Sequence, residues 1–241
     1  MAASELQILD VRPGGPDAAA LVDEAYAEVL APSFGPDELL PRDQLDRGMR
    51  DPQGDRLTVA VRDGLVVGAA VSDAPARDGI VLLTLLAARP GGRSGGVGGA
   101  LLGHLRAAWQ RSGVALVLGE VHDPRAHATG PDEDPHARLR FYERAGAELL
   151  GVPWLQPAVA PSGRRVDGML LVALHRQGWA AGADVPAAPV AAWAQRYAAA
   201  TEGRAPTDEG WARLMARYSA ASTLAVLPVA SYASIPLLAG G

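Results

Sequence analysis

The fold of this chain depends on residues 89–99, RPGGRSGGVGG, which follow an apolar run and precede a segment of helical periodicity. The run at residues 79–88 is almost wholly apolar, which predicts a central strand. After the glycines, Val97, Leu101 and Trp109 recur at helical spacing and predict a helix of about four turns. Exposed N–H groups at a helix start, with the positive end of the helix dipole, attract anions. The turn therefore predicts a phosphate or pyrophosphate site.

Two common nucleotide-binding motifs fit this turn poorly. The Rossmann fingerprint needs glycines at i, i+2 and i+5, but Gly96 and Gly98 are followed by Leu101 in the third place. A Walker-type loop needs a lysine, and all 22 basic side chains of this chain are arginines. We therefore expect neither dinucleotide binding nor nucleotide hydrolysis of the P-loop type.

A serine hydrolase is a sharper alternative. The segment Gly92-Arg93-Ser94-Gly95-Gly96 matches the nucleophile elbow G-x-S-x-G and lies between a predicted strand and a predicted helix. Asp167 and His175 follow in the order that a catalytic triad would need. The preceding Pro90-Gly91 loosens the turn, and no His-Gly-Gly segment precedes it to form an oxyanion hole.

The third interpretation is the phosphate cradle of a CoA-dependent acetyltransferase, R/Q-x-x-G-x-G/A, which Arg93, Gly96 and Gly98 match. Many glycine-rich helix starts satisfy this pattern, so a structural turn without a ligand also remains open at this point. The rest of the chain has to decide among these alternatives.

Composition favours a folded protein. The 241 residues are 49% hydrophobic and 20% charged, which is ordinary for a chain with one substantial core. The net charge of −5 does not favour a nucleic-acid partner, although a local basic groove stays open. The chain has no cysteine, which excludes disulfides, thiol catalysis and thiolate metal sites.

The first half of the chain predicts an antiparallel meander. A short strand near residues 6–11 precedes a helix from about Pro16, and residues 31–50 form a loop with a second helix. Two β-rich runs, residues 56–62 and 65–71, are separated by Asp63-Gly64, a strong hairpin signal. With the apolar run at residues 79–88, these make three adjacent strands.

The second half predicts a strand at residues 114–121, a long loop, a short helix at residues 135–145 that ends at Gly146, and two further strands at residues 147–159 and 167–175. A strand, the cradle helix and the next strand suggest a parallel crossover pair. Beyond this point the chain becomes alanine-rich and predicts a helical extension.

The segment Arg140-Phe-Tyr-Glu-Arg-Ala-Gly-Ala147 resembles the late motif of the GCN5-related N-acetyltransferase (GNAT) superfamily. The order of predicted elements is similar too, over about residues 5–176. The resemblance implies an α/β fold, with a mixed, largely antiparallel central sheet flanked by helices. It implies a GNAT-like acyltransferase domain at residues 1–176, followed by a helical C-terminal extension at residues 177–241.

In this family the central strand splays from its neighbour and the pantetheine arm of CoA pairs with its free backbone groups. The co-substrate implied here is acetyl-CoA or another acyl-CoA. The cradle around the pyrophosphate acts mainly through backbone N–H groups. By position, the residues expected to bind it are Leu86, Ala87 and Ala88 on the strand, and Arg93, Ser94, Gly95, Gly96, Val97, Gly98, Gly99 and Ala100 in the cradle.

The resemblance also implies catalytic residues. Tyr142 occupies the place of the family's usual acid, which protonates the departing thiolate. Glu120, at the end of the strand that would line the acceptor cleft, is our candidate for the base that takes a proton from the amine, with His122 and Asp123 as alternatives. An aromatic that only packs in the core and a solvated strand-end acid are the structural alternatives for Tyr142 and Glu120.

Acceptor recognition is expected from Phe34, Glu38 and His122, which fall where the family's acceptor wall forms. The chain departs from the family motif at two points. Pro135 stands near the usual asparagine, which removes a hydrogen bond but can still start a helix. Ala147 replaces the common phenylalanine and thins one core contact.

We expect a cytoplasmic protein, because the N-terminus lacks the basic and then apolar pattern of a secretory signal. The last apolar stretch, residues 224–238, is broken by Pro228 and Pro236 and is too short for a membrane span. His122, His127 and His136 match no metal motif, so no metal is predicted. The expected partner is a small-molecule or peptide amine, and the C-terminal extension is a candidate contact for a homodimer.

The sequence thus predicts direct transfer of an acetyl or other short acyl group from CoA to an amine in a ternary complex, without a covalent enzyme intermediate. Two alternatives stay open: the serine hydrolase, and a non-catalytic acyl-CoA-binding protein.

Overall fold

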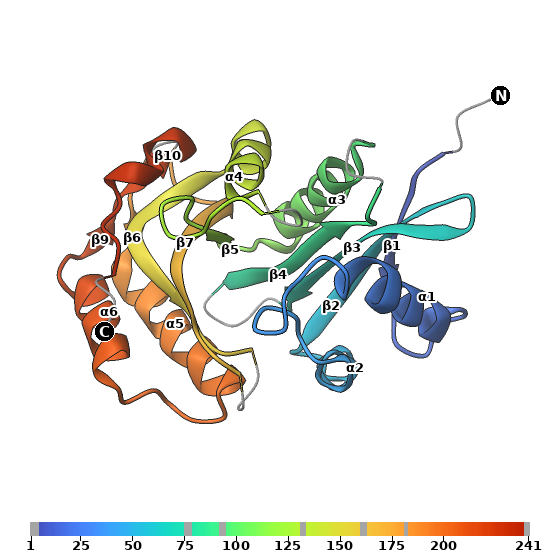
Figure 1. Ribbon diagram of the computed structural model, residues 1–241, viewed down its shortest axis with the longest axis horizontal. Helices are drawn as coiled ribbons and strands as arrows, with labels where there is room; N and C mark the ends of the chain where they lie inside the picture. Colours follow the sequence, from blue (N-terminus) through green and yellow to red (C-terminus); the bar gives the residue numbers. More distant parts are fainter. Residues whose placement is uncertain are drawn as a thin grey trace. The chain divides into compact units, whose positions relative to one another are not determined.

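The computed structural model describes residues 5–74, 79–91, 95–130, 134–159, 163–180 and 183–238 (Figure 1). It divides into two compact units. The first consists of residues 1–76 and 81–114, and the second of residues 77–80 and 115–241. Each unit is described by itself below.

The first unit contains a four-stranded antiparallel array with the order β1-β2-β3-β4. The order of elements is the expected one, with a short π-helical turn extending the first helix. The elements are β1 (Gln7–Val11), α1 (Ala18–Ala25), the π-helical turn η1 (Tyr26–Leu30), α2 (Arg42–Arg50), β2 (Asp55–Arg62), β3 (Leu65–Asp73), β4 (Ile80–Ala88) and α3 (Val97–Ser112).

The predicted hairpin is confirmed. Asp63 and Gly64 both have positive φ angles, 54° and 75°, which is the conformation of a type I′ turn. The flanking residues Arg62 and Leu65 are paired across β2 and β3. The two-residue turn therefore sets the register of the meander, as its sequence indicates.

The core of the first unit lies between the strands and the first two helices. Residues of α1, the π-helical turn and α2 bury their apolar faces against β2 and β3, with Val29, Leu30 and Leu45 almost wholly inaccessible. The hydroxyl of Tyr26 donates to the carbonyl of Leu40 at 3.1 Å and holds the loop between the helices.

Helix α3 comes unusually close to strand β3, at Gly68. A Cβ atom at this position would overlap Cγ1 of Val97 and would lie 3.1 Å from Cδ1 of Leu101 and 3.2 Å from the carbonyl oxygen of Ala87. Val97 is the first residue of α3 and is buried. The glycine on β3 therefore permits the N-terminus of α3 to pack directly on the strand.

The second unit contains a second antiparallel array with the order β5-β7-β6-β10 and a short two-stranded ladder, β8-β9. Its elements are β5 (Leu116–His122), α4 (Pro135–Arg144), β6 (Glu148–Gln156), β7 (Val166–Arg176), β8 (Val185–Pro186), α5 (Ala187–Thr201), α6 (Glu209–Ser219), β9 (Thr223–Leu224), β10 (Val226–Pro228) and the 3-10 helix η2 (Val229–Ser234).

The ends of α4 follow the predicted chemistry. Pro135 occupies the first turn, and the side chain of Asp134 accepts a hydrogen bond from the N–H of Ala137 at 2.9 Å. Gly146 closes the helix with a φ angle of 72°, the left-handed conformation that favours glycine. Asp134 is a cap that sequence reasoning did not single out.

Residues after β7 pack against the rest of the second unit. Strand β10 pairs with β6, and α5 and α6 follow one another beside the sheet (Figure 1). The guanidinium of Arg165 donates to both carboxylate oxygens of Glu202 at 2.6 and 2.8 Å and to Asp208 at 2.8 Å, which ties β7 to the two helices. No helix among the described residues is long and apolar enough to cross a membrane.

The expected fold class is confirmed: the protein is α/β, with largely antiparallel strands flanked by helices.

Two carboxyl groups in the first unit should make stability depend on pH. Asp55 and Asp73 are partners across β2 and β3, and burial raises their pKa values to about 6 and about 7, with the charge of Asp55 adding to the effect on Asp73. The folded state therefore holds more protons than the unfolded chain between about pH 4 and pH 7. We expect the free energy of unfolding to fall as the pH rises through this window.

The substitution Asp73→Asn should flatten that decline by an amount on the order of 2 kcal/mol, since one pKa unit corresponds to about 1.4 kcal/mol. Urea unfolding at pH 5 and pH 8 measures the difference. Asp167→Asn, an exposed aspartate in the other unit, serves as the control and should keep the slope of the unchanged protein. If the free energy of unfolding of Asp73→Asn fell with pH as steeply as that of the unchanged protein, the raised pKa of Asp73 would be contradicted.

The close approach at Gly68 gives a second prediction. Gly68→Ala should destabilise the first unit by about 1–3 kcal/mol, because the added methyl group overlaps Val97 beside backbone that cannot move freely. Gly103→Ala is the matched control, since a Cβ there meets no atom within 4 Å and alanine favours a helix by about 1 kcal/mol. Chemical denaturation should show that the free energy of unfolding falls in Gly68→Ala and rises in Gly103→Ala.

Candidate active site

The glycine-rich turn ends in an open helix N-terminus in the first unit. Gly96 is the N-cap of the 16-residue helix α3, with a φ angle of 70°, and has no side chain with which to cap the helix. The first turn of α3 also contains no acidic residue. Its first N–H groups and the positive end of the dipole are thus the local groups that can receive an anion.

The surroundings of this turn leave room for a ligand. Gly95, Gly96 and Gly99 are exposed, and a Cβ atom at Gly96 or Gly99 would meet no atom of the described residues within 4 Å. Val97 is buried and anchors the helix start, while Gly98 and Ala100 are partly exposed. Arg93 and Ser94 lie outside the described residues, so their contribution to the cradle stays a prediction.

The end of strand β4 leads into this turn. Leu86, Ala87 and Ala88 are partly buried and pair with Ala70, Ala69 and Gly68 of β3. The N–H of Arg89 donates to the carbonyl of Val67 at 2.9 Å.

Successive residues of a strand direct their N–H and C=O groups to alternate edges. Since Arg89 bonds to β3, the backbone groups of Leu86 and Ala88 point away from β3. Of the three predicted strand residues, these two direct their backbone groups to the other edge of β4, and their pairing with CoA stays a prediction.

An ion-pair network that sequence reasoning missed fixes the end of β4. The guanidinium of Arg89 contacts Glu24 on α1 at 3.2 Å and Glu28 on η1 at 2.8 Å, and it also donates to the carbonyl of Val66. The partners are more than 60 positions away, so no local pattern predicts them. The network holds the strand end that leads into the cradle.

Tyr142 lies on α4 in the second unit and is buried. Its ring meets that of Phe141 edge to face, with centroids 5.1 Å apart. Burial raises the pKa of the Tyr142 hydroxyl, and the charge of Arg138 opposes this only in part. The hydroxyl is therefore protonated at neutral pH, as a proton donor has to be.

Glu120 on β5 is held by two donors. The indole N–H of Trp154 donates to one carboxylate oxygen at 2.6 Å, and the hydroxyl of Tyr197 donates to the other at 3.2 Å. Hydrogen bonds to a charged acceptor are the stronger ones, so the carboxylate is well oriented. Tyr197 belongs to α5, in the C-terminal segment that the family resemblance does not cover.

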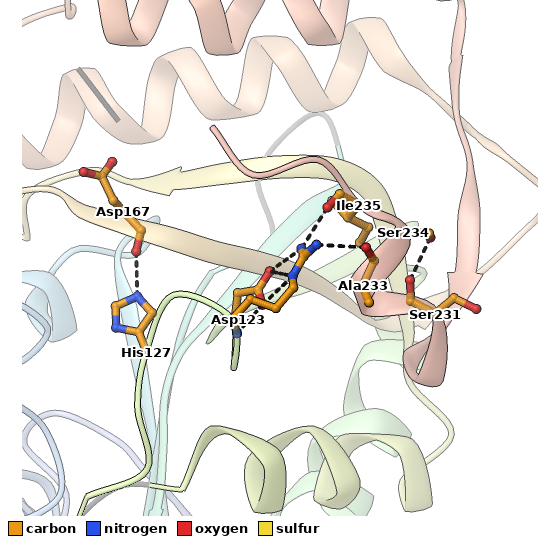
Figure 2. A network of polar contacts seen from close by, with 8 residues as sticks. Asp123, His127, Asp167, Ser231, Ala233, Ser234 and Ile235 are labelled. Carbon is orange, nitrogen blue, oxygen red and sulfur yellow. Dashed lines mark hydrogen bonds and ion pairs between the residues drawn. The ribbon is translucent and has the colours of Figure 1, made fainter. Parts of the chain in front are cut away.

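Asp123, the alternative base, is committed to a structural role. Its carboxylate is buried and accepts from the guanidinium of Arg125 at 2.6 to 3.2 Å. Arg125 also donates to the carbonyls of Ala233 and Ile235, each at 2.8 Å. Figure 2 shows the contacts that link Asp123, through Arg125, to these two residues of the C-terminal segment. The pair therefore ties the loop after β5 to the chain end.

His122 is buried at the end of β5, with its ring stacked on that of His127 at 3.9 Å between centroids. The Nε2 atom of His127 lies 2.7 Å from the carbonyl oxygen of Asp167, as Figure 2 shows. This stack leaves His122 little exposed surface, so its predicted contact with a substrate rests on the sequence alone. Among the residues that the structure describes, no three histidines or acids converge as metal ligands.

Phe34 and Glu38 follow α1 in the first unit. Phe34 is partly buried against the apolar core of that unit, and Glu38 lies near Gly35 on the adjacent turn. The structure thus places these two and the cradle in the first unit, and Tyr142, Glu120 and His122 in the second.

The geometry excludes the triad that the elbow motif suggested. Asp167 and His175 both lie on strand β7, eight residues apart. At about 3.3 Å per residue they are separated by roughly 26 Å, far beyond a hydrogen bond. Ser94 lies outside the described residues. A serine hydrolase built on Asp167 and His175 is therefore not supported.

Comparisons with known proteins agree on the fold. No family model matches the sequence, and no curated protein matches it either. Solved structures with a similar fold include the following three, whose sequence identity to this chain is low.

The first is described as an acetyltransferase of the GNAT family from Bacteroides thetaiotaomicron, with a TM-score of 0.53, 20% identity and coverage of 71% of this chain and 87% of the other. The second is an aminoglycoside 6'-N-acetyltransferase complexed with coenzyme A, with a TM-score of 0.50, 16% identity and coverage of 72% and 99%. The third is a tandem GNAT protein from the clavulanic acid pathway, with a TM-score of 0.50, 22% identity and coverage of 63% and 46%.

These similarities rest on the backbone, and they agree with the family suggested by the glycine-rich turn and by residues 140–147. The chain has the fold of the GCN5-related N-acetyltransferase superfamily.

Proposed function

We propose that this protein is an N-acyltransferase that moves an acetyl or other short acyl group from CoA to an amine, by direct transfer in a ternary complex. The observation that carries the proposal is the N-terminus of α3, which packs on β3 in a GNAT fold. Its N-cap residue is a glycine, so no side chain caps the first N–H groups of the helix. Uncapped N–H groups with free space around them suit a pyrophosphate.

The cradle would act mainly through its backbone. The N–H groups of Val97, Gly98 and Gly99 follow the N-cap, and the small residues around them let phosphate oxygens approach closely. Leu86 and Ala88 would pair with the amide groups of the pantetheine arm. Arg93 and Ser94 are proposed to complete the site on the grounds of the sequence motif.

Two residues of the second unit have the chemistry that the transfer requires. Glu120 would take a proton from the attacking amine, directly or through a water molecule, so that the nitrogen can form its bond to the acyl carbon. As the carbon–sulfur bond breaks, Tyr142 would give its proton to the thiolate. The raised pKa of Tyr142 supports the role of donor.

A non-catalytic acyl-CoA-binding protein would share the cradle but would have no need of an acid or a base. The pair of donors that orients Glu120 favours the enzyme, since a solvated strand-end acid would not be held in this way. Calorimetric titration with acetyl-CoA and a test for CoA release with a panel of amines separate the two.

Three expectations stay predictions: a cytoplasmic location, acceptor contacts from Phe34, Glu38 and His122, and a homodimer formed through residues 177–241. Within one chain, α6 already packs against β6 of its own unit. A second copy would have to use the outer faces of these helices.

A charge at the cradle tests the pyrophosphate site. Gly99 is exposed and lies in the first turn of α3, so Gly99→Asp should favour the helix by about 0.5 kcal/mol but repel an anion. We expect acetyl-CoA affinity to fall by about tenfold or more while thermal stability is kept. Gly99→Ala is the uncharged control and should bind acetyl-CoA almost normally. Unchanged affinity in Gly99→Asp would contradict the proposed cradle.

Removal of the proposed acid tests the mechanism. Tyr142→Phe keeps the buried ring and its contact with Phe141 but removes the proton, so kcat should fall by about a hundredfold with little change in the KM for acetyl-CoA. Release of CoA thiol over a panel of amines gives the rates. Tyr232→Phe, a tyrosine of η2, is the matched control. Equal turnover in Tyr142→Phe would remove Tyr142 from the mechanism.

A further inference from the structure

Five aromatic side chains of the second unit form one group, named here the aromatic cluster. Trp154 on β6 lies at its centre, and the other members come from α5 and α6. The chain has only 12 aromatic residues, and this group gathers nearly half of them. The members are Trp154, Trp193, Tyr197, Trp211 and Tyr218.

The ring geometry of the aromatic cluster is well defined. Trp193 stacks on Trp154 at 5.5 Å with an interplanar angle of 25°, and Tyr197 stacks on Trp193 at 5.6 Å and 13°. Trp211 and Tyr218 meet Trp154 edge to face, at 6.2 and 6.4 Å. The stacked faces of Trp154, Trp193 and Tyr197 thus cover one another, and the cluster is a compact group of rings.

A carboxylate lies against the aromatic cluster. Glu120 accepts hydrogen bonds from two members, Trp154 and Tyr197. It is also near a third, because burial and then the charge of Glu120 both raise the pKa of the Tyr218 hydroxyl. A carboxylate is thus held at the polar edges of two rings, in surroundings that are partly shielded from water.

Tyr218 adds an observation that packing alone does not explain. Its side chain is only 1% exposed, and its hydroxyl has no hydrogen-bond partner within the described part of the chain. A buried polar group without a partner costs about 1–3 kcal/mol, and phenylalanine would fill the same space without that cost. An unpartnered hydroxyl that lies within reach of the charge of Glu120 matches what an ammonium group requires.

The outer edge of this arrangement is open to solvent, because Glu120 and Tyr197 are both partly exposed. Trp154, Trp193, Trp211 and Tyr218 are buried and pack on one another beneath these two residues. A ligand would therefore reach the Glu120 carboxylate and the ring of Tyr197 first.

We infer that Glu120 and the aromatic cluster bind the acceptor amine, and that this acceptor has one positive charge and an apolar alkyl or aryl body. Glu120 and the Tyr218 hydroxyl accept hydrogen bonds from the ammonium group, and the partly exposed ring of Tyr197 contacts the body. A polyhydroxylated, multiply charged acceptor fits poorly, because the aromatic ring would desolvate its polar groups. The inference rests on the proposed transferase function and assigns the acceptor site to the C-terminal helices.

The probe that tests this is 2-phenylethylamine, compared with its neutral analogue 2-phenylethanol. Quenching of tryptophan fluorescence follows binding, since three tryptophans line the site. The unchanged protein should bind the amine at least about tenfold more tightly than the alcohol, as expected for a charge-assisted hydrogen bond. Glu120→Gln should abolish the preference, and Tyr197→Phe should reduce it.

Tyr218→Phe separates a ligand role from a packing role. A binding role predicts that amine affinity falls several-fold while thermal stability is kept or rises, because a buried hydroxyl without a partner is removed. Unchanged amine affinity in this variant, or equal binding of amine and alcohol, overturns the inference. Tyr232→Phe, outside the aromatic cluster, should bind the amine as the unchanged protein does.

Acetyl-CoA affinity, measured by calorimetry on the same variants, keeps the two proposals apart. If acetyl-CoA binds to all of them but the amine preference is absent, the acceptor assignment fails and the transferase proposal stands. If acetyl-CoA does not bind to the unchanged protein, the proposed function itself fails.

Discussion

The close packing of α3 on β3 at Gly68 is the constraint on which the candidate CoA site depends. Because Gly68 has no side chain, Val97 can lie directly on the strand, and the start of the helix is held by a buried residue rather than by a capping side chain. The N–H groups of the first turn are left for a ligand. Arg89 fixes the adjacent strand end through Glu24 and Glu28, so the turn is anchored on both sides.

In the second unit, the corresponding constraint is the burial of charged groups by the C-terminal segment. Arg125 joins the Asp123 carboxylate to the carbonyls of Ala233 and Ile235, and Arg165 joins Glu202 and Asp208. Buried or partly buried charges need such partners, since an unpaired one is costly. Residues 177–241, which the sequence predicts as a helical extension, are therefore integrated with β5, β6 and β7. Tyr197 of this segment donates a hydrogen bond to Glu120.

The similarity to known structures at 16–22% identity has a physical reason. A site made of backbone N–H groups and of glycines with room around them constrains conformation and residue size more than side-chain identity. Apolar strands accept many combinations of valine, leucine and alanine provided that volume and pattern are kept. A fold of this kind can therefore persist where the sequence alone matches no family model.

Local chemistry determined what the sequence alone could predict: the Asp63-Gly64 turn, the glycine-started helix, Gly146 at the end of α4 and the apolar strands all depend on neighbouring residues. The contacts of Glu120 with Trp154 and Tyr197 span 34 and 77 positions, and no periodicity encodes partners so distant. The tertiary structure alone decided that Asp123 is bound by Arg125, that Asp167 and His175 lie too far apart for a triad, and that two members of the aromatic cluster donate hydrogen bonds to Glu120. These depend on how strands and helices pack, which a single sequence pattern does not specify.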